Sequence, residues 1–210
     1  LTNHPTARID AIEISQVSCQ ALQNKYAENP NVSISQRDFL FDPEVNLWRN
    51  LGGRYDCVVA NPPYGAQIEK SKRQILKALH NNEYVKETYG LFLRTCIDLT
   101  KNHGILVFIL PDTYQTLHLH KALRKYILQK CKILKILNFP SNFFPNVSYG
   151  YANMSIIVLQ KSDDAIQNAN NRTRFYGNFR TISDFKKLPD HEIARVPQSL
   201  IAAEPNLSFS

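Results

Sequence analysis

Cysteine is scarce in this chain of 210 residues, and the spacing of the four that occur excludes common uses of this residue. No two form a C-x-x-C pair, so we predict neither a zinc site nor a redox pair of that kind. They are typical of reduced core thiols in a cytosolic protein. The six histidines also lack metal-ligand spacing, and we predict no metal. The cysteines are Cys19, Cys57, Cys96 and Cys131.

Long apolar runs and targeting signals are missing as well. No stretch of 18 apolar residues occurs, which argues against a membrane-spanning helix, and no signal peptide is recognisable. A length of 210 residues with 43% apolar side chains suits one domain with a sizeable core and room for an appendage. The first residue is Leu1 rather than Met, so we expect the sequence to come from a longer chain.

Acidic residues are in the minority, which gives a formal net charge of +7. The excess is local, because residues 117–137 carry a run of Lys, Arg and His side chains with no Asp or Glu. A solvated helix face would have the same composition. A positive surface of this kind also suits a polyanion partner.

Apolar runs of strand length alternate with helical spacing along the first three quarters of the chain. Residues 16–26, 91–99 and 117–131 show helical periodicity, Ser15 is a candidate N-cap and Gly104 a candidate helix stop. This alternation predicts an α/β fold with a mostly parallel sheet covered on both faces and a last strand that returns antiparallel. The predicted strands are residues 7–14, 32–35, 55–60, 105–110, 133–139 and 154–160.

The character of the sequence changes after Lys161. We predict one domain over residues 1–161 and a further region over 162–210, beginning with a polar linker. Residues 172–179 form a candidate strand, and the rest is punctuated by proline. This region reads either as the start of another domain or as a tail packed on the first.

The most informative motif is Asn61, Pro62, Pro63 and Tyr64, directly after the predicted strand 55–60. Open α/β sheets bind ligands at the carboxyl ends of their strands. Two prolines fix the backbone and remove two N–H donors, so their carbonyls can face only a ligand or water. The Asn amide adds an acceptor and the Tyr ring a stacking surface. Together they predict a site that grips a planar amino group.

Acidic and polar side chains also end the preceding strands. Glu13 and Asp38 close the first two predicted strands, and Phe39 follows Asp38. An acid at such a strand end typically holds ribose hydroxyls, and an Asp followed by Phe can bind and stack on an adenine. A lone Glu there is more often a solvated terminus. The ordered series that leads to Asn61 is more specific.

With these residues in place, the chain resembles the S-adenosylmethionine-dependent DNA adenine-N6 methyltransferases of bacterial restriction–modification systems, over roughly residues 7–161. The resemblance is to the arrangement in which the cofactor motifs precede the catalytic motif and the target-recognition domain comes last. It implies a partial catalytic domain over residues 1–161 and the start of a target-recognition region within residues 162–210. It implies a Rossmann-like class I methyltransferase sheet, S-adenosyl-L-methionine as cofactor, double-stranded DNA as partner and a prokaryotic cytoplasmic location. The implied reaction is methyl transfer to the N6 amine of an adenine turned out of the duplex.

The resemblance also implies a role for each matched residue. The cofactor would be bound by Glu13 at the ribose, by Asp38 and Phe39 at the adenine, and by Asn61. The catalytic motif would be Asn61, Pro62, Pro63 and Tyr64. The target base would stack between Tyr64 and a second aromatic, for which Phe144 is our choice and Phe143 the alternative.

One departure from the family pattern is the absence of a Gly-rich loop, because none of the seven glycines forms a G-x-G. We expect the first strand, this loop and the first helix to lie upstream of Leu1. In the family that strand is central, so two strands would be left with unpaired edges. Self-association or the missing N-terminal segment would complete the sheet, and this chain alone would bind the cofactor poorly.

Two other readings use the same residues. The same amine-binding site would suit a protein glutamine amide or an RNA base, so one alternative is a methyltransferase with another substrate. A methyltransferase-like module that only binds nucleic acid or a partner is the non-catalytic alternative, and the missing loop favours it.

Overall fold

The computed structural model describes residues 4, 6–65, 68–80, 87–143 and 153–209. These fall into two compact units, Leu1–Leu47 and Trp48–Ser210. Each unit is described by itself. Helix α2 (Pro43–Asn50) begins in the first and ends in the second.

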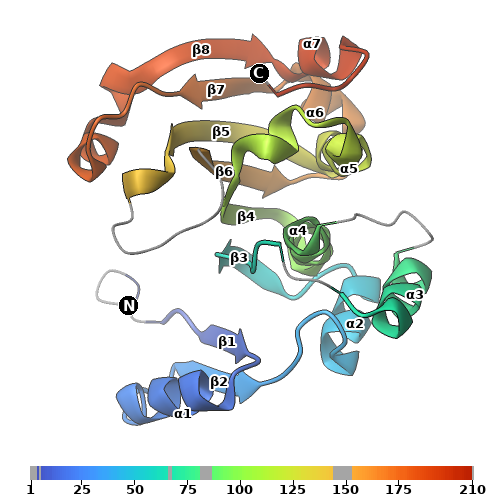
Figure 1. Cartoon of the computed structure of the whole chain (residues 1–210), viewed down its shortest axis with the longest axis vertical. Coiled ribbons are helices and arrows are strands. Elements are labelled where there is room, and N and C mark those ends of the chain that lie inside the picture. Colours follow the sequence, from blue (N-terminus) through green and yellow to red (C-terminus); the bar gives the residue numbers. More distant parts are fainter. Residues whose placement is uncertain (1–3, 5, 66–67, 81–86, 144–152, 210) are drawn as a thin grey trace. The chain divides into compact units, whose positions relative to one another are not determined.

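The first unit consists of two parallel strands and one helix. Strand β1 (Ile9–Glu13) pairs with β2 (Val32–Gln36), and α1 (Gln16–Lys25) connects them (Figure 1). The predicted N-cap is confirmed, since the Ser15 hydroxyl accepts the backbone N–H of Ser18 at 3.3 Å. This cap fixes the turn directly after Glu13, so the carboxyl end of β1 is held in place.

The second unit is built on a six-stranded sheet in the order β3-β4-β6-β5-β7-β8. Pairs β3/β4 and β5/β7 are parallel, whereas β4/β6, β5/β6 and β7/β8 are antiparallel. The α/β class and the antiparallel return of β6 are confirmed. The sheet is mixed rather than mostly parallel, because β6 lies antiparallel between β4 and β5 and because β8, which was not predicted, adds a further antiparallel pair. The strands are β3 (Tyr55–Ala60), β4 (Thr100–Pro111), β5 (Cys131–Pro140), β6 (Asn153–Lys161), β7 (Arg172–Tyr176) and β8 (Glu192–Pro197).

Helices α4 and α5 share the core of this unit with strands β4, β5 and β6. Leu91, Leu93 and Ile97 of α4 are fully buried, as are Leu123 and Ile127 of α5. The helices are α3 (Lys70–Leu79), α4 (Thr88–Leu99), α5 (Lys121–Lys130), α6 (Ala165–Asn170), α7 (Gln198–Ala203) and the 3-10 turns η1 (Asp112–Gln115), η2 (His118–His120), η3 (Ser141–Phe143) and η4 (Ile182–His191).

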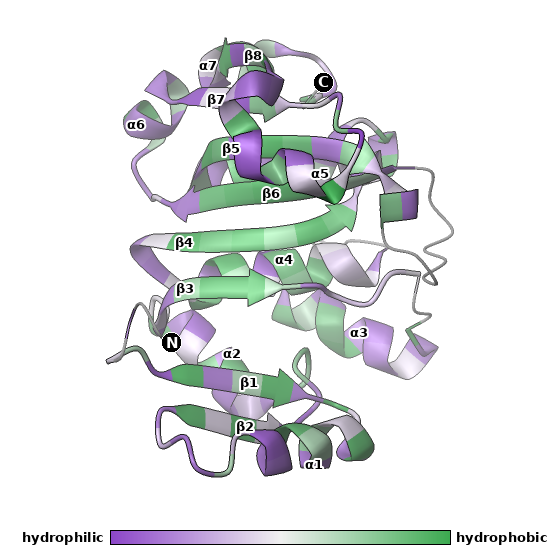
Figure 2. Cartoon of the chain, turned by 90° about the vertical axis from the view of Figure 1, so that its left-hand side faces the viewer, coloured by the Kyte–Doolittle hydropathy of each residue, from purple (hydrophilic) through white to green (hydrophobic). Residues whose placement is uncertain are grey.

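The two faces of the sheet differ in how well they are covered. Leu106 and Phe108 of β4 are fully buried, whereas the alternate residues Ile105 and Val107 are half-buried. In Figure 2 the apolar strands β3, β4 and β6 face the viewer, with α4 behind them. Val59 of β3 is 75% exposed. On the side of the sheet away from α4, apolar side chains of β3 and β4 are therefore partly exposed to solvent.

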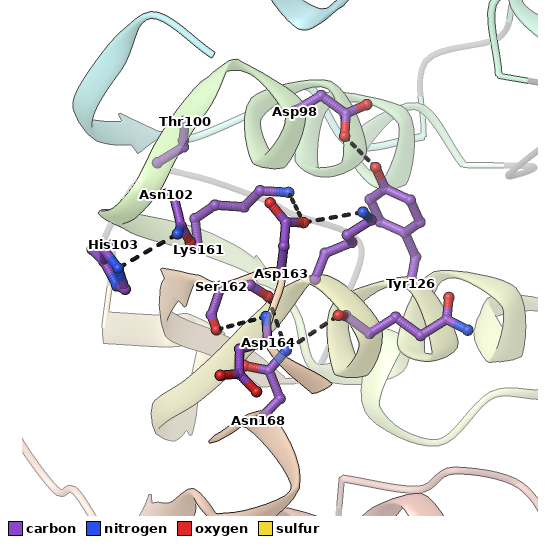
Figure 3. A network of polar contacts seen from close by, with 12 residues as sticks. Asp98, Thr100, Asn102, His103, Tyr126, Lys161, Ser162, Asp163, Asp164 and Asn168 are labelled. Atoms are coloured by element: carbon purple, nitrogen blue, oxygen red, sulfur yellow. Dashed lines mark hydrogen bonds and ion pairs between the residues drawn. The ribbon is translucent and has the colours of Figure 1, made fainter. Parts of the chain in front are cut away.

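Residues beyond Lys161 continue the same unit. Figure 3 shows the polar contacts at this point: Asp163 accepts from Lys130 at 3.0 Å and pairs with Lys161 at 3.3 Å. The side chain of Asn168, 1% exposed, donates to the carbonyls of Gln129 and Ser162. Strand β7 then pairs with β5, so this segment is anchored to the sheet. Its assignment as the start of a target-recognition region stays a prediction.

Two local expectations are wrong. Helix α4 ends at Leu99, and Gly104 lies inside β4, where a Cβ would meet the carbonyl oxygen of Asp56 at 2.9 Å. Gly104 therefore permits close strand packing rather than a helix stop. Cys57 is exposed, whereas the other three cysteines are buried.

Two absences apply to the described residues alone. Within them, no helix combines the length and the apolar character needed to cross a bilayer. Nor do three or more His, Cys, Asp or Glu side chains gather there as metal ligands do.

Candidate active site

The predicted catalytic motif forms the corner at the carboxyl end of β3. The last pair between β3 and β4 is Ala60 with Phe108. The next residue, Asn61, is exposed, Pro62 is buried and Pro63 is exposed. Prolines cannot donate to a sheet ladder, so the strand ends here. The corner thus presents the Asn61 side chain outward, next to a buried and rigid backbone.

Tyr64 ties this corner back to the neighbouring strand. Its hydroxyl donates to the carbonyl oxygen of Ile109 at 2.8 Å. Ile109 lies one residue beyond the last β3/β4 pair, so its carbonyl has no β3 residue opposite it in that ladder. The hydrogen bond replaces the next rung of the ladder and fixes where the Tyr64 ring lies.

The Tyr64 hydroxyl also donates to the side-chain oxygen of Asn61. A phenol has one proton, so it shares that proton between two acceptors, the Asn61 amide oxygen and the Ile109 carbonyl. An amide oxygen has two lone pairs. Asn61 can therefore keep this contact and accept a second hydrogen bond from a substrate amine.

Tyr64 packs against a group of buried side chains that we call the aromatic cluster. Phe139 and Phe143 stack within it, with ring centroids 5.9 Å apart, and Phe185 of η4 contacts both edge-on. Phe143 is only 9% exposed. The buried members of the cluster are Leu137, Phe139, Phe143, Met154, Tyr176 and Phe179.

This packing bears on the choice of the second stacking aromatic. The Phe143 ring is already enclosed by Phe139 and Phe185, which makes it a wall of the cluster rather than an open surface. Phe144, our choice, lies outside the described residues. Its role as the second ring stays a prediction.

A buried polar pair lies behind Tyr64. The ring of Tyr89 contacts that of Tyr64 edge-on at 6.3 Å, and its hydroxyl lies 2.7 Å from Nε2 of His120. Burial, helped by the nearby Arg124 charge, lowers the pKa of His120 to about 4. His120 is thus neutral at pH 7 and does not belong to the positive surface predicted for residues 117–137. No sequence pattern indicated this buried, neutral state, because the partner of His120 is Tyr89, 31 positions away.

The predicted cofactor residues lie at the carboxyl edge of β1 and β2 in the first unit. Glu13 pairs in register with Gln36, so Asp38 follows two residues beyond the same edge. One Glu13 carboxylate oxygen accepts the Ser15 backbone N–H at 2.8 Å. Glu13, Asp38 and Phe39 are all half-buried. Carboxylates at this edge can accept hydrogen bonds from the ribose hydroxyls and the adenine amino group of S-adenosylmethionine, and the aromatic ring can stack on its adenine.

The structure therefore brings the predicted residues together in two sets. Glu13, Asp38 and Phe39 share the edge of one sheet, and Asn61 and Tyr64 share the corner of the other. The sequence motifs predicted both sets. They did not predict the hydroxyl of Tyr64 as a donor, because its acceptor on Ile109 is 45 positions away.

Comparison with known proteins matches this chain to one family. Residues 5–144 match the model of the Eco57I restriction-modification methylases. The modification methylase CviBIII of Paramecium bursaria Chlorella virus NC1A is 36% identical over 138 residues, which are 64% of this chain and 32% of that protein. The type II methyltransferase M.AccI of Acinetobacter calcoaceticus is 24% identical over the whole chain and 37% of its own length. The chain thus spans about a third of the length of these relatives.

A solved structure shares the fold. The modification subunit of a putative type I restriction enzyme from Vibrio vulnificus YJ016 superposes with a TM-score of 0.71 at 15% identity. The match covers 92% of this chain and 44% of that one. At this identity the likeness shows the fold alone, and it confirms the predicted methyltransferase-like α/β sheet.

Proposed function

The chain belongs to the Eco57I restriction-modification methylase family, and from that premise we propose that its protein methylates the N6 amine of adenine in double-stranded DNA. The methyl donor is S-adenosyl-L-methionine, and the base is turned out of the duplex before transfer. The observation that carries this proposal is the exposed Asn61 amide at the carboxyl end of β3, held by the Tyr64 hydroxyl.

The corner activates the amine by hydrogen bonding. The Asn61 amide oxygen and the Pro62 carbonyl each accept a hydrogen bond from the amine, which turns the nitrogen lone pair out of conjugation with the ring. When bound, S-adenosylmethionine supplies an electrophilic methyl group on its sulfonium. Alignment of that group with the nitrogen, and stabilisation of the charge that develops on nitrogen, account for most of the rate.

Stacking holds the base during this step. We assign the Tyr64 ring to one face of the adenine and Phe144 to the other, each contributing about 1–3 kcal/mol. Tyr64 is suited to this because its ring is half-buried against the aromatic cluster and its hydroxyl is tethered to Ile109. A fixed ring loses little conformational freedom when the base arrives.

We assign cofactor binding to Glu13 at the ribose, to Asp38 and Phe39 at the adenine, and to Asn61. Among the described residues, β1 pairs only with β2 and β3 only with β4. We infer that a strand from the parent protein or from a second copy completes these edges. The isolated 210-residue chain should therefore bind S-adenosylmethionine weakly in a calorimetric titration, and a dissociation constant in the micromolar range or below would contradict this.

A methyl-transfer assay separates the competing functions. The complete protein that carries this sequence is given a labelled methyl donor with adenine-containing duplex DNA, with transfer or ribosomal RNA, or with a glutamine-containing release factor. Label on adenine N6 of the duplex supports the proposal. Label only on RNA or on glutamine overturns the substrate assignment. A protein that binds DNA but labels none of these substrates is the non-catalytic module.

A further inference from the structure

Three basic side chains lie in one row across neighbouring strands of the second unit. Lys135 of β5 pairs in register with Arg174 of β7, and Arg174 lies opposite Arg195 of β8. Figure 1 shows these three strands side by side. Residues paired in register project from the same face of a sheet. We call Lys135, Arg174 and Arg195 the cation row.

The burial pattern shows that the sheet face is open to solvent at the cation row. Arg174 and Arg195 are exposed and Lys135 is half-buried, whereas the alternate residues Thr173 and Phe175 of β7 are buried. Because successive side chains of a strand point to opposite faces, Thr173 and Phe175 face the core, whereas Arg172 and Arg174 face outward on the side that is covered again at Tyr176.

Like charges placed opposite each other destabilise a sheet. One member of the row is compensated, since the Arg195 guanidinium pairs with Glu192 at 2.9 Å. Within the described parts of the chain, Lys135 and Arg174 make no ion pair. Arg172, two positions before Arg174 on the same face, is exposed and adds a further charge. Lys135, Arg174 and Arg172 thus form a positive strip that no carboxylate of the described residues neutralises.

The row lies on the same sheet as the candidate active site, and its nearest member, Lys135 of β5, is two strands from β4. Leu137 and Tyr176 follow Lys135 and Arg174 by two positions on the same face, about 6.6 Å further along each strand. Both belong to the aromatic cluster on which Tyr64 packs. A polymer held at Tyr64 can therefore extend along the cation row.

We propose that the cation row binds phosphates of the DNA duplex next to the base turned out at Tyr64. This inference rests on the proposed function and names a second contact with the same substrate. Two strand spacings place Lys135 and Arg195 about 10 Å apart. A DNA strand carries one phosphate for each 3.4 Å of helix axis, so the row spans about three phosphates. Arginine forks bind phosphate oxygens in pairs.

The test is the salt dependence of DNA binding by the complete protein, measured by fluorescence anisotropy with a labelled duplex. Each phosphate contact contributes about 0.9 to the slope of log affinity against log salt. Lys135→Gln with Arg174→Gln should reduce the slope by about 1.8. Affinity should fall about eightfold for each lost contact at roughly 0.1 M salt. The kcat at saturating DNA should stay unchanged while KM for DNA rises.

Lys101→Gln is the matched control. It also removes one exposed cation of the same sheet, but Lys101 lies near the amino end of β4 and pairs with Asp56 at 3.0 Å. Its slope should equal that of the parent protein, and Arg174→Lys should restore most of the affinity. Thermal unfolding of the double variant checks the fold, and its midpoint should not fall, because the substitutions remove repulsion.

The outcomes separate this inference from the proposed function. Methyl transfer to DNA with an unchanged slope in the double variant overturns the cation row alone. A row-dependent slope without methyl transfer overturns the proposed reaction alone. A slope change seen with transfer RNA but not with duplex DNA overturns the DNA assignment, as does a complete protein that binds no duplex.

Discussion

Removing the hydroxyl of Tyr64 tests the geometry of the corner most specifically. Tyr64→Phe keeps the ring on the aromatic cluster but removes the donor that contacts both Asn61 and the Ile109 carbonyl. The Asn61 amide then loses the contact that aims its oxygen at the substrate. One hydrogen bond contributes about 0.5–1.5 kcal/mol. We therefore expect kcat to fall about 2- to 13-fold, with KM for DNA within about twofold of the parent value because stacking is kept.

Tyr64→Ala provides the second half of this experiment. It removes the ring as well, so the stacking term of about 1–3 kcal/mol is lost and KM for DNA should rise about 5- to 160-fold. Steady-state transfer of labelled methyl groups to duplex DNA measures both variants. Tyr26→Phe is the matched control, since Tyr26 is an exposed residue at the end of α1 and should change neither constant. An unchanged kcat for Tyr64→Phe would refute the orienting role of the hydroxyl.

Two further predictions concern stability. Arg124 is fully buried and donates to the carbonyls of Tyr114, Leu117 and Asn206, each at 2.8 Å. Arg124→Met should therefore lower the free energy of unfolding, measured by urea titration, by about 3 kcal/mol. A loss below about 1 kcal/mol would contradict this. Burial lowers the pKa of His120 to about 4, so between about pH 6.5 and pH 4 the unfolded chain binds a proton that the folded chain does not. Stability should fall as pH falls through this window, and His120→Gln should weaken that dependence; an equal pH dependence in the variant would exclude His120 as its source.

The parts of the fold that the sequence predicted are those set by local signals. Strand β3 has the predicted bounds, because an apolar run ends in two prolines that cannot continue a ladder. Helix α1 begins after the predicted cap at Ser15. In both cases one short segment contains the whole physical reason for the structure.

The parts that were missed depend on distant partners. Strand β8 carries no buried stripe that a sequence pattern could indicate, since Ile193, Ala194 and Arg195 are all exposed. Its pairing with β7 is what makes it a strand. Gly104 resembles a helix stop in sequence, but its neighbour in space is the Asp56 carbonyl. Local patterns cannot identify such contacts, because they form only when remote segments pair.

The candidate site divides in the same way. The residue types of the motif predicted an amine-binding corner, which follows from the chemistry of Asn61 and two prolines. The aromatic cluster behind it could not be predicted, because Phe139 lies in β5 whereas Phe179 and Phe185 lie far later in the chain, between β7 and β8. The register of Lys135 with Arg174 is likewise a product of strand pairing. The sequence therefore predicted the chemistry of the site but not the side chains that pack around it.

The most direct test of the whole account is methyl transfer by the complete protein and by its Asn61→Ala variant, with N6-methyladenine in duplex DNA as the product measured. The parent protein should form N6-methyladenine. The variant should bind the duplex normally and lose about 10²–10³-fold or more in kcat, because the acceptor that orients the amine is gone. Methylation by Asn61→Ala at the parent rate would contradict the assignment of this corner as the catalytic site.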